Sequence, residues 1–192
     1  MEFSPETIFS IIIGIGLAAS VGFRIFVPLF ALSLASFYGI IPLNESWEWV
    51  GSSTAIIILG IATIVEILAY FIPWLDNLLD TIAVPLAAVA GTAVMVATVS
   101  NLDPTITWAL AIIAGGGTAT AIKGSTSTTR LASTATTAGI ANPVISTVET
   151  GTSIIMSVFS IFIPILAIIL VVLIFWILFK VFKLFKPLKS TK

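Results

Sequence analysis

Long apolar runs alternate with short polar or proline-containing stretches along most of the chain. Such runs predict membrane helices, because about 20 consecutive apolar residues are needed to cross a bilayer. The predicted helical segments cover residues 7–22, 26–41, 54–72, 83–99, 105–122, 125–141 and 154–179. A short amphipathic stretch, residues 74–80, follows Pro73. The pattern therefore predicts an all-α polytopic integral membrane protein, with these seven segments in a single membrane domain over residues 1–192.

The segment at 125–141 departs from this apolar pattern. Ser and Thr occupy 11 of the 20 positions from 118 to 137, although 58% of the whole chain is hydrophobic. A membrane protein tolerates such a polar helix only where protein or trapped water, and not lipid, surrounds it. The same stretch carries Lys123 and Arg130. We therefore expect the functional site here.

Two topologies remain open for the short segments. Segments one, two, five and six would each be about 24 to 27 Å long as helices, slightly less than the ~30 Å hydrocarbon core. Each pair is joined by a few residues around a base, Arg24 or Lys123. If all four are full spans, both bases lie at the cytoplasmic surface. If each pair is a re-entrant hairpin, both bases lie deep in the membrane. The positive-inside rule slightly favours full spans.

Charge indicates the orientation. Charged residues are only 9% of the chain, compared with about a quarter in a soluble domain. With seven spans, Arg24, Lys123 and the basic tail at 181–192 fall on one side, whereas acids such as Glu48 and Glu149 fall on the other. Basic residues mark the cytoplasmic side, which predicts an N-out, C-in topology. Because the lysines concentrate in the tail, nucleic-acid binding has no support.

The two halves of the chain look duplicated. Residues 33–40 share several small residues with residues 133–140, and Gly51 recurs as Gly151. This register predicts an internal parallel repeat of about 100 residues, with repeat one at about 7–100 and repeat two at about 105–180. The alternative is chance matching of small residues in a biased composition.

Several polar side chains are candidates for binding a substrate. On a helix, one face would carry the residues Thr126, Arg130, Ser133 and Thr137. Hydroxyl groups and a guanidinium on one face can replace the hydration shell of an anion or a phosphate headgroup. Together with Arg24 and Lys123, these residues form the predicted substrate-binding set. The alternative is close helix packing through small residues.

Glu66 is the lone acid in an apolar run, and an ionisable side chain there is a functional hypothesis by default. With full spans, its depth matches that of Arg130, which predicts an intramembrane ion pair with a gating or proton-coupling role. The alternatives are a structural pair and a Glu66 that burial keeps neutral.

Enzyme chemistry has little support. The chain contains no Cys and no His, which excludes disulfides, thiol nucleophiles and imidazole bases. We predict no cofactor and no metal site. Asp76 and Asp80 form an Asp-x-x-x-Asp pair, as in membrane transferases that hold magnesium and diphosphate. Those families need a second acidic cluster, so a solvated amphipathic turn is the better interpretation.

The stretch Gly14-Ile-Gly16-Leu-Ala-Ala-Ser-Val-Gly22-Phe-Arg24, with its Gly- and Thr-rich echo around Lys123-Gly124, resembles an uncharacterised domain-of-unknown-function family of small bacterial integral membrane proteins. The resemblance covers most of the chain, implies a bacterial inner (plasma) membrane, and brings no established activity. Short broken helices also look like those of the undecaprenyl-phosphate flippases, which use re-entrant hairpins and buried bases. That likeness is an architectural analogy.

These observations lead to two functional hypotheses. The first is a small membrane transporter or flippase for an anionic solute or lipid headgroup, with membrane lipid as its surroundings. The second is a non-transporting membrane scaffold or assembly partner, whose small residues pack against other helices. Because the chain is small, it leaves little room for a solute pathway of its own, which favours a homodimer.

Overall fold

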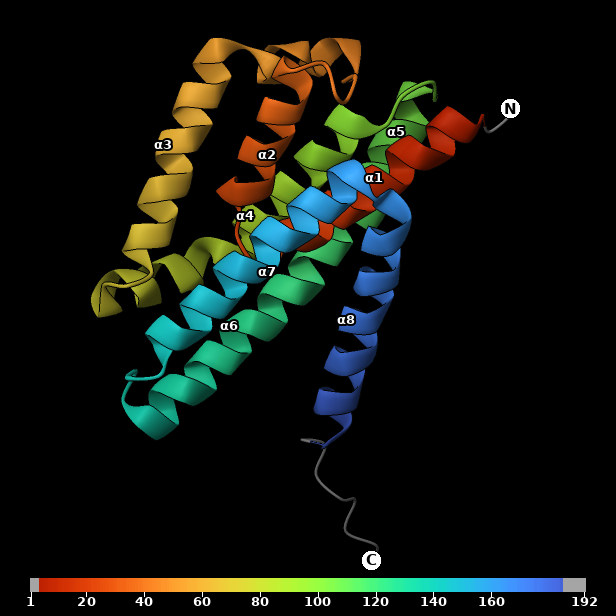
Figure 1. The fold of residues 1–192 in the computed structure, drawn as a ribbon. Helices are drawn as coiled ribbons and strands as arrows, with labels where there is room; N and C mark the ends of the chain where they lie inside the picture. The colour runs from red at the N-terminus through yellow and green to blue at the C-terminus, as the bar shows by residue number, and fades with distance from the viewer. Residues whose placement is uncertain (1–3, 185–192) are drawn as a thin grey trace, which may run out of the picture.

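The computed structural model describes residues 4–184, and over that range the chain forms helices and turns without strands. Figure 1 shows the arrangement. The elements are α1 (Pro5–Val21), α2 (Phe26–Phe37), the 3₁₀ helix η1 (Glu45–Gly51), α3 (Ser53–Ala69), α4 (Pro73–Thr98), α5 (Pro104–Leu110), the π-helix η2 (Ala111–Gly116), α6 (Gly117–Thr137), α7 (Asn142–Phe162) and α8 (Pro164–Leu184). The all-α fold is thus confirmed.

Helices α1 and α2 form a V whose tip points into the molecule (Figure 1). The α1 helix begins where the Ser4 side chain accepts a hydrogen bond from the Thr7 N–H, with Pro5 in the first turn. It ends at a break over residues 22–25, and α2 starts at Phe26. In this break Arg24 is completely buried, so the tip of the V lies inside the protein.

The predicted separation between segments 105–122 and 125–141 is wrong. Residues Pro104–Thr137 form one long helical stretch, in which η2 joins α5 to α6. Lys123 lies within this helix and not in a loop. Its ammonium is buried and donates to the carbonyl oxygen of Phe23, 3.2 Å away. At 34 residues, the stretch is about 51 Å long. It exceeds the ~30 Å hydrocarbon core of a bilayer.

Two further boundaries differ from the prediction. The amphipathic stretch 74–80 and the segment 83–99 belong to one helix, α4, which contains Pro85 in its interior. The predicted helix 154–179 is instead divided between α7 and α8. Pro164 lacks an N–H and its ring clashes with the preceding turn, so α7 ends and the chain changes direction (Figure 1).

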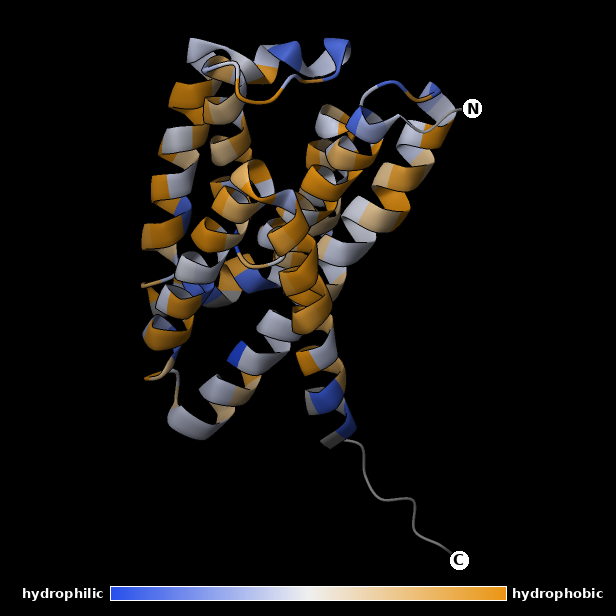
Figure 2. Cartoon of the chain, turned by 45° about the vertical axis from the view of Figure 1, so that its right-hand side comes forward, coloured by the Kyte–Doolittle hydropathy of each residue, from blue (hydrophilic) through white to orange (hydrophobic). Residues whose placement is uncertain are grey.

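Several helices are long and apolar enough to cross a membrane, as expected of a membrane protein. Among the described residues these are Trp74–Thr98, Pro104–Thr137 and Asn142–Phe162. Residues Glu45–Gly51 and Ser53–Ala69 add a fourth if the two helices, bent by 65°, count as one span. Figure 2 shows hydrophobic residues over most of the helices and hydrophilic ones in the loops at the upper edge. The predicted count of seven spans is not confirmed.

The predicted internal repeat is not confirmed either. Residues Pro5–Val21 and Phe26–Phe37 are two helices that meet at an angle, whereas the corresponding residues Pro104–Thr137 form one continuous stretch. One local similarity remains: Gly39 and Gly139 both have positive φ, at +69° and +83°. The basic tail at 181–192 lies largely outside the described residues.

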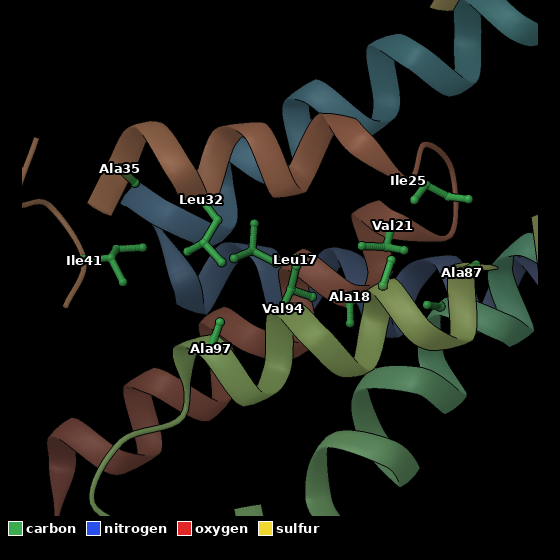
Figure 3. Close-up of a cluster of buried hydrophobic side chains, with 12 residues drawn as sticks. Leu17, Ala18, Val21, Ile25, Leu32, Ala35, Ile41, Ala87, Val94 and Ala97 are labelled. Atoms are coloured by element: carbon green, nitrogen blue, oxygen red, sulfur yellow. The ribbon is translucent and has the colours of Figure 1, made fainter. Parts of the chain in front are cut away.

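The largest apolar core lies between α1, α2 and α4. Leu17 and Val21 of α1 pack with Leu32 of α2 and Val94 of α4 (Figure 3). These four side chains are completely or almost completely buried. Alanines fill much of the remaining core, and such small residues allow helix backbones to approach closely.

A polar contact joins α1 to α7. The Ser20 hydroxyl lies 2.9 Å from the Ser153 hydroxyl and 2.7 Å from the Ser157 hydroxyl. Ser20 also donates to the Ser153 carbonyl, and Ser153 donates back to the Ser20 carbonyl. Hydroxyl pairs of this kind hold membrane helices together. They fix α7 against the tip of the V.

We expect Gly115→Ala to destabilise the protein by about 1–3 kcal/mol, because it overpacks the contact between η2 and α4. A Cβ on Gly115 would lie 2.5 Å from the carbonyl oxygen of Gly91 and 2.7 Å from the Cβ of Met95. Gly117→Ala is the matched control. Nothing lies within 4 Å of its added Cβ, so it should gain up to ~1 kcal/mol of helix propensity. Thermal unfolding in detergent measures both, and equal effects would contradict the packing.

Candidate functional site: a buried charge cluster

Every basic residue that precedes Lys180 lies in one interior cluster. Arg24 and Lys123 are 0% exposed and Arg130 is 1% exposed. They meet four carboxylates and a tyrosine that come from α3, α4 and α7. We call this set the charge cluster, and its members are Arg24, Glu66, Tyr70, Asp76, Asp80, Lys123, Arg130 and Glu149.

Arg24 connects the tip of the V to α7. Its Nε donates to the Thr150 hydroxyl at 2.9 Å, and its Nη2 donates to the Ser146 carbonyl at 2.9 Å and to the Ser146 hydroxyl at 2.5 Å. Its Nη1 lies 3.5 Å from Oε2 of Glu149. Three residues of α7 therefore hold the guanidinium.

Arg130 is bound more tightly, between α4 and α7. Its Nε lies 3.1 Å from Oε1 of Glu149, and its Nη2 lies 2.5 Å from Oε2 of the same carboxylate. Its Nη1 binds Asp76. The other oxygen of Asp76 accepts a hydrogen bond from the Asn142 side chain at 3.0 Å. Bidentate contacts between arginine and carboxylate are among the strongest hydrogen bonds in proteins.

Glu66 does not pair with Arg130, so the predicted ion pair is wrong. Its two carboxylate oxygens instead accept the backbone N–H groups of Ile25, at 2.8 Å, and Phe26, at 2.9 Å. These two N–H groups lie at the start of α2, where no carbonyl of the helix itself can accept from them. The positive end of the helix dipole at this point also favours a negative charge. Glu66 of α3 thus caps α2 from another helix, and its position fixes the tip of the V.

Tyr70, at the end of α3, lies at the centre of the bases. The ring centroid is 4.0 Å from the Arg24 guanidinium carbon, 4.5 Å from that of Arg130 and 5.4 Å from the Lys123 ammonium. All three distances are within the ~6 Å range of cation–π contacts. Because an aromatic face attracts cations, the ring partly offsets the repulsion between the three positive charges.

The acids outnumber the bases in the charge cluster by one, since it has four carboxylates and three cations. Asp80 lies one helical turn beyond Asp76 on α4 and interacts electrostatically with Arg130 and Lys123. One of its oxygens is buried and, within residues 4–184, has no hydrogen-bond partner. Over the same residues, no group of three Asp or Glu side chains is placed to hold a metal ion.

Two cavities of similar size reach the charge cluster from different sides. One, of about 300 Å³, lies between α2, α3 and α4, and its lining includes Glu66 and Tyr70. The other, of about 310 Å³, lies between α6 and α7 and is lined by Phe23, Thr126, Thr129, Val144, Ile145, Val148 and Glu149. Most of both linings is apolar, and each contains one charged residue, a carboxylate of the cluster.

The structure brings together some of the predicted site residues and not others. Arg24, Lys123, Arg130 and Glu66 belong to the charge cluster. Thr126 lines the cavity between α6 and α7. The remaining two are outside: the hydroxyls of Ser133 and Thr137 lie 3.5 Å apart, at a partly exposed and an exposed position near the end of α6.

Two acids lie elsewhere than their sequence pattern predicts. Glu149 was expected on the outer side, away from every base, yet it contacts both Arg24 and Arg130. Asp76 was expected in a solvated turn, yet it is 2% exposed and pairs with Arg130. The overlooked signal is a polar stripe at helical spacing along α7, which contains the buried residues Asn142, Ser146, Glu149, Ser153, Ser157 and Ser160.

Comparison with known proteins adds a family and no activity. No match to the chain was found among curated proteins or among solved structures. A family described as "Domain of unknown function (DUF4126)" matches residues 11–183. This match includes the whole charge cluster and nearly all of the described helices, so the chain belongs to the DUF4126 family.

Proposed function

We propose that the protein is a small membrane transporter or flippase for an anionic solute or an anionic lipid headgroup, with the charge cluster as its substrate site. The observation that carries the proposal is the convergence of Arg24, Lys123 and Arg130 around the Tyr70 ring. These are all of the basic residues before Lys180.

The cost of burying charge supports a functional cluster. Ionisable side chains inside a membrane protein are expensive, and they usually mark a substrate, ion or proton pathway. Replacing a buried ion pair by apolar residues is often neutral or stabilising, so stability alone does not explain why such pairs are present. The break between α1 and α2 supports the same conclusion, because irregular backbone at membrane depth occurs where it is buried in protein or lines a cavity.

The chemistry of the bases favours an anion. Two of the three are arginines, whose planar guanidinium groups match carboxylate and phosphate oxygens in a bidentate way. In the proposed mechanism, α1 and α2 form a re-entrant hairpin that presents Arg24 at depth, and the two cavities provide access from different sides. We keep the N-out, C-in orientation, because η1, which contains Glu45 and Glu48, lies near one end of the helices and the C-terminal end of α8, which contains Lys180, lies near the other (Figure 1).

We expect the purified protein, reconstituted in phosphatidylcholine vesicles, to move one of two probes at least about tenfold faster than protein-free vesicles. The probes are radiolabelled sulfate and a fluorescent phosphatidylglycerol. Arg130→Lys should reduce the rate to less than about a tenth, because lysine keeps the charge but loses the bidentate contact. Since both carboxylates stay compensated, the variant should remain folded.

Glu48→Gln is the control for the flux measurement, because Glu48 lies in η1, away from the charge cluster. If the wild-type protein moves neither probe, the transport proposal is wrong. A protein that moves neither probe and instead copurifies with a defined assembly partner would match the scaffold hypothesis.

A further inference from the structure

We infer that Glu149 is an internal anion, and that an external oxyanion replaces it at Arg24 and Arg130 when Glu149 takes up a proton. This inference rests on the proposed function and adds to it a ligand chemistry and a coupling ion. It follows from three features of the described residues: the contacts of Glu149, an unfilled donor on Arg24, and the cavity that reaches Glu149 from outside.

The Glu149 carboxylate is the group that the two arginines share. Its Oε2 lies 2.5 Å from Nη2 of Arg130 and 3.5 Å from Nη1 of Arg24. Its Oε1 lies 3.1 Å from Nε of Arg130. A carboxylate bridging two guanidinium groups has the contacts that a bound phosphate, sulfate or carboxylate would make.

The site is incomplete with Glu149 alone. Nη1 of Arg24 is buried, and among the residues that the structure describes it has no hydrogen-bond partner. Its 3.5 Å distance to Glu149 is longer than the ~2.7–2.9 Å of a charge-assisted hydrogen bond. A buried donor without a partner is costly. An oxyanion with three or four oxygens could contact Nη1 of Arg24 and both donors of Arg130 at the same time.

The cavity between α6 and α7 gives Glu149 access to a ligand. Its volume is about 310 Å³, and Glu149 is the one charged residue in its lining. Two threonines, Thr126 and Thr129, are also in that lining. Asp76 also binds Arg130, but it does not line this cavity and is held by Asn142 as well. Glu149 is therefore the carboxylate that a ligand entering here would displace.

Charge balance sets the coupling. Glu149 contacts Arg24 at the tip of the V and Arg130 on α6. It interacts electrostatically with Lys123 on α6 and Asp80 on α4. Around the same arginines lie Asp76 on α4, which binds Arg130, and Glu66 and Tyr70 on α3, which interact with Arg24. With all carboxylates ionised, the cluster has three positive and four negative charges. A proton that moves from water to Oε2 of Glu149 cancels one negative charge and weakens its contacts with both arginines. An oxyanion that then binds brings negative charge back to the two arginines, so protonation of Glu149 and anion binding favour each other.

The test uses the full-length protein in phosphatidylcholine nanodiscs and sulfate as the probe, because the charge of sulfate does not change in the range used. Binding is measured by calorimetry at about pH 5.5 and about pH 7.5, a range in which arginine, lysine and tyrosine side chains of ordinary pKa keep their charge. The wild-type protein should bind sulfate at least about tenfold more tightly at the lower pH. Glu149→Gln, which imitates the protonated acid, should bind sulfate at about pH 7.5 about as tightly as the wild-type protein does at about pH 5.5.

A second arm distinguishes a lipid headgroup from a free anion. Nanodiscs that contain phosphatidylglycerol, whose charge is also constant in this range, are melted at both pH values without sulfate. If the lipid is the ligand, phosphatidylglycerol should raise the melting temperature of the wild-type protein more at low pH, and Glu149→Gln should remove that pH dependence. Sulfate should then have no effect. Glu48→Gln should behave like the wild-type protein in both arms.

Glu149→Asp keeps the measurement informative if Glu149→Gln does not fold. It retracts the carboxylate by one methylene, so it should bind sulfate several-fold more tightly than the wild-type protein at neutral pH while keeping a pH dependence. The inference is overturned if the folded Glu149 variants bind sulfate and phosphatidylglycerol as the wild-type protein does, or if nothing binds. Binding as expected without flux would overturn the proposed transport and not this site.

Discussion

Arg130→Gln is expected to destabilise the protein by about 3–5 kcal/mol, because it removes the positive partner of two buried carboxylates at once. Asp76 would lose its only basic contact among the described residues, and Glu149 would keep only the 3.5 Å contact with Arg24. Breaking a buried ion pair from one side leaves an uncompensated charge, which costs more than the pair contributes. Thermal and denaturant unfolding in detergent measure the loss.

A second substitution separates charge compensation from packing. In Arg130→Gln with Asp76→Asn, the cluster loses one positive and one negative charge, and Glu149 keeps Arg24 as its partner. The double variant should therefore recover a large part of the stability lost in Arg130→Gln. A double variant less stable than Arg130→Gln alone would show that the unpaired charge of Asp76 is not the main cause of the stability lost in Arg130→Gln.

Glu66→Ala is expected to cost roughly 2–4 kcal/mol, because it leaves the buried N–H groups of Ile25 and Phe26 without acceptors. Both donors belong to the start of α2, which has no cap from its own side chains. Glu66→Ala should weaken the first turn of α2 in particular, in addition to lowering the free energy of unfolding of the whole protein. Hydrogen exchange should increase at the first turn of α2 and at the break that precedes it, before it increases in α4.

Two further variants test the role of Glu66 as a cap. Glu66→Gln retains one carbonyl oxygen as an acceptor, so it should cost about half as much as Glu66→Ala. Glu48→Ala, an exposed acid in η1, should change stability by less than ~0.5 kcal/mol. If Glu66→Ala and Glu48→Ala had the same small effect, the cap would be unimportant for the position of α2.

The sequence was sufficient to identify the three bases that the structure buries together. In the Ser- and Thr-rich stretch on α6, Lys123 and Arg130 are buried as expected, whereas most of the Ser and Thr side chains are exposed or partly exposed. Arg24 was also a candidate, and it is completely buried in the protein. Local pattern is enough for these conclusions, since polarity within an apolar chain is itself the signal.

The partners of the bases were not predictable in the same way. Glu149 was assigned to the outer side because the helix after residue 141 was placed at 154–179, and the effect of Pro164 was overlooked. With α7 starting at Asn142, Glu149 falls within the helix and on its polar stripe. Asp76 reaches Arg130 only because α4 continues without interruption from Pro73. Such pairings depend on how the helices are arranged relative to one another. The spacing of residues within one helix does not reveal this arrangement.

The π-helix η2 has a consequence for the register of everything that follows it. A π-helical turn holds one residue more than an α-helical turn, and one residue corresponds to a rotation of about 100° around the helix axis. Without this extra residue, Lys123 and Arg130 would point about a quarter of a turn away from Tyr70, and outward-facing residues such as Leu131 would turn with them. The tight contact of η2 with Gly91 of α4 therefore fixes the rotation of α6 about its axis, and with it the direction in which Lys123 and Arg130 point.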